Sequence, residues 1–205
     1  ANAIINEVTS SNGAISVGGT TSATGAISAG GNITFGGTAD VAGVTSTSGV
    51  ISFTGDATAS GTISAQGDIT FGANAIINEV TSSNGAISVE GTTSANGNIT
   101  SAQSQTFNGA FTLNKTVTIL AKNNTVLFKD TVNGTYDLAI GNNANATNVT
   151  FEKSAGSTDV INSLFVKGNI TAKDKITTKG NISVGGTTSA NGDITSAQSQ
   201  TFNGA

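Results

Sequence analysis

Few side chains of this sequence could catalyse a reaction or hold a metal ion. The chain has no His and no Cys, which excludes a Ser-His-Asp triad, a Cys nucleophile and a His/Cys zinc site. Acid–base chemistry would therefore depend on the acidic residues, the lysines or Tyr136. Pairs such as Asp56/Asp68 or Asp130/Asp137 do not supply the clustered acids and bases that a polysaccharide lyase needs. The sequence predicts that the protein is not an enzyme, and it predicts no catalytic, cofactor-binding or metal site.

The sequence contains many Asn-x-Ser/Thr sequons, the acceptor motif for N-glycosylation. They begin at Asn32, Asn98, Asn114, Asn123, Asn133, Asn145, Asn148, Asn169 and Asn181. Several of them arise from the repeat described below, because Asn-Ile-Thr is part of its six-residue unit. The sequons therefore support two hypotheses, a set of glycosylation sites or an unmodified by-product of the repeat.

The charged residues indicate which partners to expect. All lysines lie between residues 115 and 179, and residues 1–110 carry only acidic charges. The formal net charge is −4, and a slightly acidic surface repels phosphate backbones, so no nucleic-acid partner is expected. The chain lacks an apolar run of about 18 residues, the minimum for a spanning helix, so no membrane insertion is expected. Any signal or anchor would lie outside this segment.

A six-residue repeat organises most of the chain. Glycines recur at steps of six or a multiple of six, at positions 13, 19, 25, 31, 37, 43, 49, 55, 61, 67, 85, 91, 97 and 109. Counted from this glycine, the third to fifth places most often hold Ile, then Ser or Thr, then Val, Ala or Phe, as in residues 33–35. This alternation predicts a three-residue strand whose outer two side chains share one face. The Asn-Gly and Gly-Gly pairs between strands predict corners with a positive φ.

Similar residues align when the chain is wound into coils of about 18 residues. One side then stacks bulky pairs: Ile15/Val17, Ile33/Phe35, Ile51/Phe53, Ile69/Phe71 and Ile87/Val89. A second side stacks smaller pairs: Thr21/Ala23, Ala39/Val41, Ala57/Ala59, Ala75/Ile77 and Thr93/Ala95. A third side alternates with a two-coil period: Ile27/Ala29, Thr45/Thr47, Ile63/Ala65, Thr81/Ser83 and Ile99/Ser101. The sequence predicts an all-β fold, a single-chain β-solenoid (β-helix) with three-sided coils.

Longer duplications preserve this arrangement. Residues 1–17 and 73–89 share the text ANAIINEVTSSNGAISV, and residues 85–110 recur with few changes as residues 180–205. We expect one continuous domain and a fragment of a longer array. It is divided into a regular hexad solenoid (1–110), less regular coils with longer turns (111–166) and the resumed hexad (167–205). In the middle region we expect a thicker core made of Phe111, Leu113, Ile119, Leu120, Leu127, Phe128, Leu138, Ile140, Phe151, Leu164, Phe165 and Val166.

Runs such as GNITF and GDITF, with GTTSANGDITS, resemble the repetitive β-helix exoproteins of bacterial surfaces. These are the filamentous-haemagglutinin-like proteins of two-partner secretion systems and the passengers of autotransporter adhesins. The resemblance covers nearly the whole chain and implies a right-handed β-helix in a secreted or cell-surface fibre. The strict hexad is also shared with left-handed hexapeptide solenoids, so the handedness stays open. Acyltransferases on that left-handed fold use a catalytic His, which this chain lacks.

Two functional hypotheses follow from the repeat and the resemblance. In the first, the chain is a structural repeat region of a secreted or cell-surface adhesin and acts as a rigid extracellular stalk. In the second, it is a self-assembling extracellular filament, sheath or surface-layer protein whose coils stack end to end. Open coil ends make further copies of the chain or adjoining repeats the expected partners, beside a ligand on a host or neighbouring cell. The expected location is the bacterial cell surface or the extracellular space.

Overall fold

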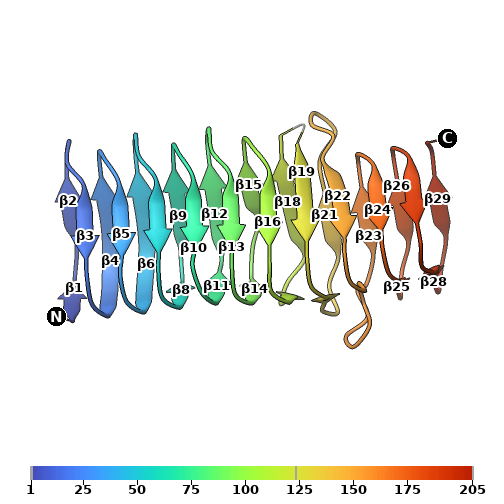
Figure 1. Cartoon of the computed structure of the whole chain (residues 1–205), viewed down its shortest axis with the longest axis horizontal. Helices are drawn as coiled ribbons and strands as arrows, with labels where there is room; N and C mark the ends of the chain where they lie inside the picture. Colours follow the sequence, from blue (N-terminus) through green and yellow to red (C-terminus); the bar gives the residue numbers. More distant parts are fainter. Residues whose placement is uncertain (1, 123, 205) are drawn as a thin grey trace.

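The computed structural model describes residues 2–122 and 124–204, and within these residues it contains strands and turns but no helix. The strands stack in parallel into a rod of about eleven coils, with the N-terminus at one end and the C-terminus at the other (Figure 1). Each coil contributes to three sides, which we call sides 1, 2 and 3. Residues that meet on neighbouring regular coils are about 18 apart in the sequence, so the predicted β-solenoid is confirmed.

Each side is a ladder of parallel strands, and the chain passes from side 2 to side 3 and then to side 1 in every coil. Side 1 contains β3 (Ile15–Val17), β5 (Ile33–Phe35), β7 (Ile51–Phe53), β10 (Ile69–Phe71), β13 (Ile87–Val89), β16 (Gln105–Phe107), β19 (Thr125–Phe128), β22 (Asn148–Phe151), β24 (Ile170–Ala172) and β27 (Thr188–Ala190). Side 2 contains β1 (Ala3–Ile5), the starts of β4 (Thr21–Ala29) and β6 (Ala39–Ser46), β8 (Ala57–Ala59), β11 (Ala75–Ile77), β14 (Thr93–Ala95), β17 (Phe111–Leu113), β20 (Val132–Asn133), β25 (Ile176–Thr178) and β28 (Ile194–Ser196). Side 3 contains β2 (Val8–Ser10), the ends of β4 and β6, β9 (Thr62–Ala65), β12 (Glu79–Ser82), β15 (Ile99–Ser101), β18 (Val117–Ala121), β21 (Leu138–Ile140), β23 (Leu164–Val166), β26 (Ile182–Val184) and β29 (Gln200–Phe202).

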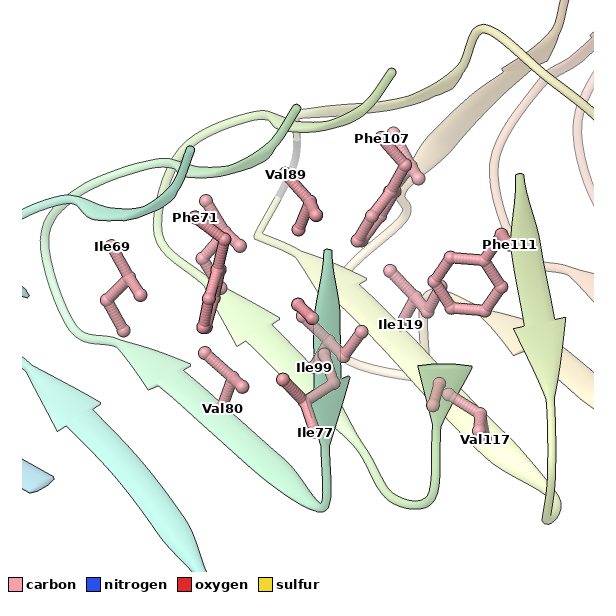
Figure 2. Packing of buried hydrophobic residues seen from close by; sticks show 14 of the residues in the cluster. Ile69, Phe71, Ile77, Val80, Val89, Ile99, Phe107, Phe111, Val117 and Ile119 are labelled. Carbon is pink, nitrogen blue, oxygen red and sulfur yellow. The ribbon is translucent and has the colours of Figure 1, made fainter. Parts of the chain in front are cut away.

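Side 1 supplies the bulkiest part of the core. In its regular strands two apolar side chains point inward and the hydroxyl residue between them points outward, as the period of two requires. Phe35, Phe53 and Phe71 stack with ring centroids 4.8 and 5.0 Å apart. Figure 2 shows Phe71, Val89 and Phe107 projecting from this side into the interior. Identical residues in one column meet at stacking distance because neighbouring strands lie one hydrogen-bond step apart.

Side 2 is lined by smaller side chains, which lets the coil close into a narrow triangle. Ala39, Ala57 and Ala75 occupy its inward positions and are almost completely buried. Thr21 and Thr93 also point inward, and within the described residues their hydroxyl oxygens have no hydrogen-bond partner. The small column predicted for this side is therefore present, with two buried hydroxyl groups that the core does not satisfy.

Side 3 differs from the prediction by one residue in every second coil. A constant step would place Thr45 inside, but Val44 and, two coils later, Val80 are buried instead. Ile27 pairs with Val44 and Val44 pairs with Ile63, so the spacing alternates between 17 and 19 residues. The shift arises at the corner between sides 2 and 3. It replaces a threonine by a valine in the core, which burial of apolar surface favours.

Several hexad glycines are required by close contact between coils, and the predicted positive φ at these corners is wrong. Among the described residues, positive φ occurs at Gly134, Gly141 and Gly156, all in the middle region. A Cβ on Gly25 would overlap the carbonyl oxygen of Asn6 in the preceding coil. A Cβ on Gly97 would overlap the carbonyl oxygen of Asn78 in the same way. Glycine is therefore needed at these corners because the neighbouring backbone leaves no room for a side chain.

After β17 the coils lengthen while the strands remain parallel. Hydrogen-bonded residues of successive coils are here 20 to 26 apart in the sequence. The additional residues form two loops that project from the rod, one between β21 and β22 and one between β22 and β23 (Figure 1). Asn142 and Asn145 close the first loop with an antiparallel bridge. The insertions are thus confined to corners, and the ladders continue past them.

Most residues predicted for the thicker core of the middle region are buried, but two are not. Phe165 is 38% exposed, and Leu127 is only partly buried. In β23, Leu164 and Val166 point inward, so the alternation of the strand turns Phe165 outward. The prediction that these three consecutive residues all belong to the core was wrong, because a strand buries alternate residues on one face.

The duplicated segments 85–110 and 180–205 lie on different sides of the rod. Residues 87–89 form β13 on side 1, whereas their copies, residues 182–184, form β26 on side 3. The longer coils between the two copies shift the phase by one side. The same text folds correctly on either side because all three sides are built from one strand-and-corner unit.

Candidate functional site

Most sequon asparagines connect successive coils through their side-chain oxygen. Asn32 Oδ1 accepts a hydrogen bond from the backbone N–H of Val50 at 3.1 Å. Asn98 Oδ1 accepts one from the N–H of Thr118 at 2.8 Å. Equivalent bonds to the following coil are made by Asn133, Asn148, Asn169 and Asn181. These asparagines therefore stabilise the stack, which gives the Asn of the repeat a structural role.

The remaining sequon asparagines have other surroundings. Asn114 Nδ2 donates to Ser94 Oγ at 2.6 Å, so the nitrogen that would carry a glycan is engaged. Asn145 Nδ2 donates to Asn142 Oδ1 at 3.4 Å within the projecting loop, and Asn123 lies outside the described residues. The structure distributes the sequons along the rod and does not gather them into one site. Glycosylation stays a prediction, which an intact mass equal to that of the bare chain would contradict.

Two aspartates of the regular coils, Asp56 and Asp68, have the same corner role as the asparagines. Asp56 Oδ1 accepts the backbone N–H of Asn74 at 3.1 Å, and Asp68 Oδ1 accepts that of Ala86 at 2.8 Å. Within residues 2–122 and 124–204, no group of three or more His, Cys, Asp or Glu side chains is placed to hold a metal ion. These carboxylates are therefore used in joining coils.

An ion pair connects the end of the middle region to the first coil of the resumed hexad. Lys173 Nζ lies 2.8 Å from Glu152 Oε1, and both side chains are partly exposed to solvent. The hydrogen bond from Lys173 and its positive charge lower the pKa of Glu152, and Lys129 adds a smaller effect in the same direction. Because the pair is exposed, we interpret it as a local link between coils and not as a catalytic group.

Inward-facing serines on side 3 form buried hydrogen bonds that the sequence pattern did not predict. Ser46 Oγ donates to Gly31 O at 2.8 Å and accepts from Gly49 N at 3.0 Å. Ser82 makes the same two bonds to the equivalent glycines two coils later. The signal that could have identified them is the Val-Thr-Ser triplet at 44–46 and 80–82, which recurs with the two-coil period.

Gln105 is the largest polar side chain in the core, and it was also missed. Its Nε2 donates to Ser101 Oγ at 3.0 Å and to Leu120 O at 2.9 Å, the latter on the next coil. In the C-terminal copy, Gln200 is exposed and donates to Ile194 O at 3.2 Å. Gln105 therefore connects its coil to the next one.

A groove opens on the outer surface of side 3, over β21, β23 and β26. Its volume is about 310 Å³, and its side-chain lining includes Asp137, Ser163, Phe165, Asn181 and Ser183. Asp137 and Asn181 stand at corners, whereas Phe165 is the outward residue of its strand. An exposed aromatic ring, a carboxylate, an amide and hydroxyl groups come together in its lining.

These features define a class of protein, a repetitive three-sided β-solenoid whose polar side chains mainly connect one coil to the next. In comparisons with known proteins, no family model, no curated protein and no solved structure matches this chain. Throughout the described ranges, no helix is long and apolar enough to cross a membrane.

Proposed function

We propose that this chain belongs to the structural repeat region of a secreted or cell-surface bacterial adhesin or filament, where it acts as a rigid stalk. The observation that carries the proposal is the parallel pairing of strands, which continues from the first coils to the last on the sides of the rod. About eleven coils at about 4.8 Å per coil give a rod about 50 Å long. A rod of this kind holds two attached parts at a fixed distance.

The stiffness of the rod follows from its three ladders. A bend in any direction must stretch the backbone hydrogen bonds of at least one side, because each coil is paired with both neighbours. Corner side chains such as Asn32 and Asp68 add bonds between coils outside the ladders. Each coil contacts only its immediate neighbours, so coils can be added or removed without a change to a central core. These are the properties that a stalk requires.

Surface labelling tests this proposal directly. Antibodies raised against the 205-residue chain should label intact source cells or their secreted material, without permeabilisation. Negative-stain microscopy of the purified chain should show isolated rods about 50 Å long, because about eleven coils rise about 4.8 Å each. Label that appears only after permeabilisation would contradict an extracellular stalk.

A second candidate function is a self-assembling extracellular filament, and one observation favours it. The same text forms β13 on side 1 and β26 on side 3, where it pairs with strands of different sequence. One coil unit therefore accepts different neighbours, as end-to-end stacking of separate copies requires. Fibres whose length grows with protein concentration would support the filament, and rods of constant length would support the stalk.

A further inference from the structure

On side 3, Phe165 places an aromatic ring outward between short side chains. Phe165 is the central residue of β23, and its register partners on the neighbouring strands are Ala139 and Ser183. Leu164 and Val166 fill the core beneath it, so the ring must point outward. The short neighbours leave the flanks of the ring uncovered, which explains why a groove forms at this position.

The groove is large enough for a small ligand. Its volume of about 310 Å³ is at the lower end of the range of known ligand sites, about 300 to 1,000 Å³. It spans three neighbouring strands, which lie about 4.8 Å apart, so it extends about 10 Å along the rod. The floor is backbone and buried aliphatic residues of β21 and β23, which are held by the ladder and need not rearrange on binding.

The polar groups around the ring are held in place by hydrogen bonds and keep capacity for others. Asp137 Oδ1 accepts from Asn162 Nδ2 at 2.6 Å, which orients the carboxylate and leaves its second oxygen as an acceptor. Asn181 Oδ1 accepts from Ser199 N at 3.3 Å, which leaves the amide NH₂ of Asn181 as a donor. The hydroxyl groups of the two lining serines add donors and acceptors.

We propose that this groove binds a pyranose unit of a neutral saccharide, with one apolar C–H face of the sugar against the Phe165 ring. An aromatic ring beside a carboxylate, an amide and two hydroxyl groups matches a ligand with an apolar face and a rim of hydroxyl groups. An anionic ligand would be repelled by Asp137, the charged side chain of the lining. A quaternary ammonium ligand would use the carboxylate and the ring, but it would leave the amide and the hydroxyl groups without a partner.

This saccharide site goes beyond the stalk proposal, because a rod needs no ligand groove to hold a distance. The length and surface location of the rod do not depend on whether sugars bind. The groove on side 3 is equally compatible with a stalk and with a filament. Failure of the binding experiment below would leave the microscopy and labelling results unchanged, so the two proposals can be judged separately.

Saturation-transfer NMR on the whole chain tests the proposal. The probes are methyl β-D-glucopyranoside, methyl β-D-galactopyranoside, methyl α-D-mannopyranoside and methyl N-acetyl-β-D-glucosaminide, with choline chloride as the cationic comparison. We expect at least one glycoside to receive saturation at the C–H protons of one ring face, with a Kd of about 1 mM, as suits a small ligand. Phe165→Ser should weaken that binding about 10-fold, a loss of about 1.4 kcal/mol, and Phe165→Tyr should retain it.

A matched control uses another exposed apolar residue on a different side. Ile76 is the outward residue of β11 and is 45% exposed, so Ile76→Ser removes a comparable apolar group away from the groove. This variant should bind the glycoside as the unmodified chain does. The proposal is overturned if no glycoside receives saturation, or if Phe165→Ser and Ile76→Ser bind equally well. Choline binding that is stronger than sugar binding and is lost in Asp137→Asn would also overturn it, in favour of a cation site.

Discussion

At the scale of single residues, this protein uses its polar side chains to connect coils. Asn98 and Asp68 occupy the same place of the hexad at two different corners, and each accepts a backbone N–H from the next coil at 2.8 Å. Either Asn or Asp can make this bond because both provide the required acceptor oxygen. The same requirement explains why sequon-like text recurs in the repeat.

Replacing one corner acceptor should weaken the rod by the value of one hydrogen bond. Asn98→Ala leaves the N–H of Thr118 without its partner, and we expect a loss of about 1 kcal/mol in the free energy of unfolding. Asn98→Asp should be close to neutral, because Asp68 makes the equivalent bond to Ala86. Chemical denaturation of both variants measures the difference. Equal stability of the Ala and Asp variants would show that the corner bond contributes nothing.

Removing a buried hydroxyl group that has no hydrogen-bond partner should have the opposite effect and stabilise the rod. Thr93 is 1% exposed, and its hydroxyl oxygen has no hydrogen-bond partner in the described chain. Thr93→Val keeps the shape and removes the unsatisfied group, so we expect a gain of about 1 kcal/mol. Thr70→Val, on the exposed outer surface of β10, is the control and should change little. A lower melting temperature for Thr93→Val than for the unmodified chain would contradict this account.

The Glu152–Lys173 pair gives the chain a defined response to acid. The pKa of Glu152 is lowered in the folded state, so its ionised carboxylate stabilises the fold at pH values above the pKa of an unfolded glutamate. That contribution is lost as the pH falls through the lowered pKa. Lys173→Met removes both main causes of the shift, and an NMR titration of the Glu152 carboxyl should then give a higher pKa. An unchanged titration curve would mean that the ion pair does not persist in solution.

At the scale of the strand and its corner, the glycine of the hexad determines how closely coils can stack. A Cβ at Gly97 would overlap the carbonyl oxygen of Asn78, whereas a Cβ at Gly18 would meet no atom within 4 Å. We expect Gly97→Ala to cost about 2 kcal/mol, as overpacking does. Gly18→Ala should be neutral or slightly stabilising, because alanine restricts the unfolded chain. Thermal melts of the two variants, compared directly, decide whether the repeat needs glycine for close stacking of the coils or for its backbone freedom.

The elements show which parts of the fold could be predicted from the sequence. The hexad and its alignment at about 18 residues predicted the strands and sides 1 and 2, because each inward position repeats a residue type. The inward register of side 3 could not be predicted, since Val44 and Thr45 are neighbours and a corner shorter by one residue decides between them. The groove was not predicted either. Phe165 stands in an apolar triplet, and its outward direction follows from the phase of the longer coils.

At the scale of the whole molecule, the rod is a one-dimensional stack in which two coils form the true repeating unit. The corner between sides 2 and 3 is one residue shorter in every second coil. The longer corner, which contains Gly25 or Gly61, lies against the shorter corner of a neighbouring coil. In the coil with the shorter corner, Ser46 bonds glycines at the next corner. Duplication in whole two-coil blocks preserves this alternation. Duplication of a single coil would place two corners of the same kind together.

Two deletions distinguish these lengths. Removing residues 36–71 takes out two coils, and Ile27 would then pair with Val80, as Ile63 does in the intact chain. We expect a rod shorter by about 10 Å in small-angle X-ray scattering, with a melting temperature close to that of the full chain. Removing residues 36–53 takes out one coil, stacks Ile27 on Ile63 and deletes the Ser46 bonds. This variant should melt below the shorter two-coil deletion, although it keeps more residues. If it melts above that deletion, the single coil is the repeating unit after all, and the alternation of corners on side 3 has no part in holding the stack together.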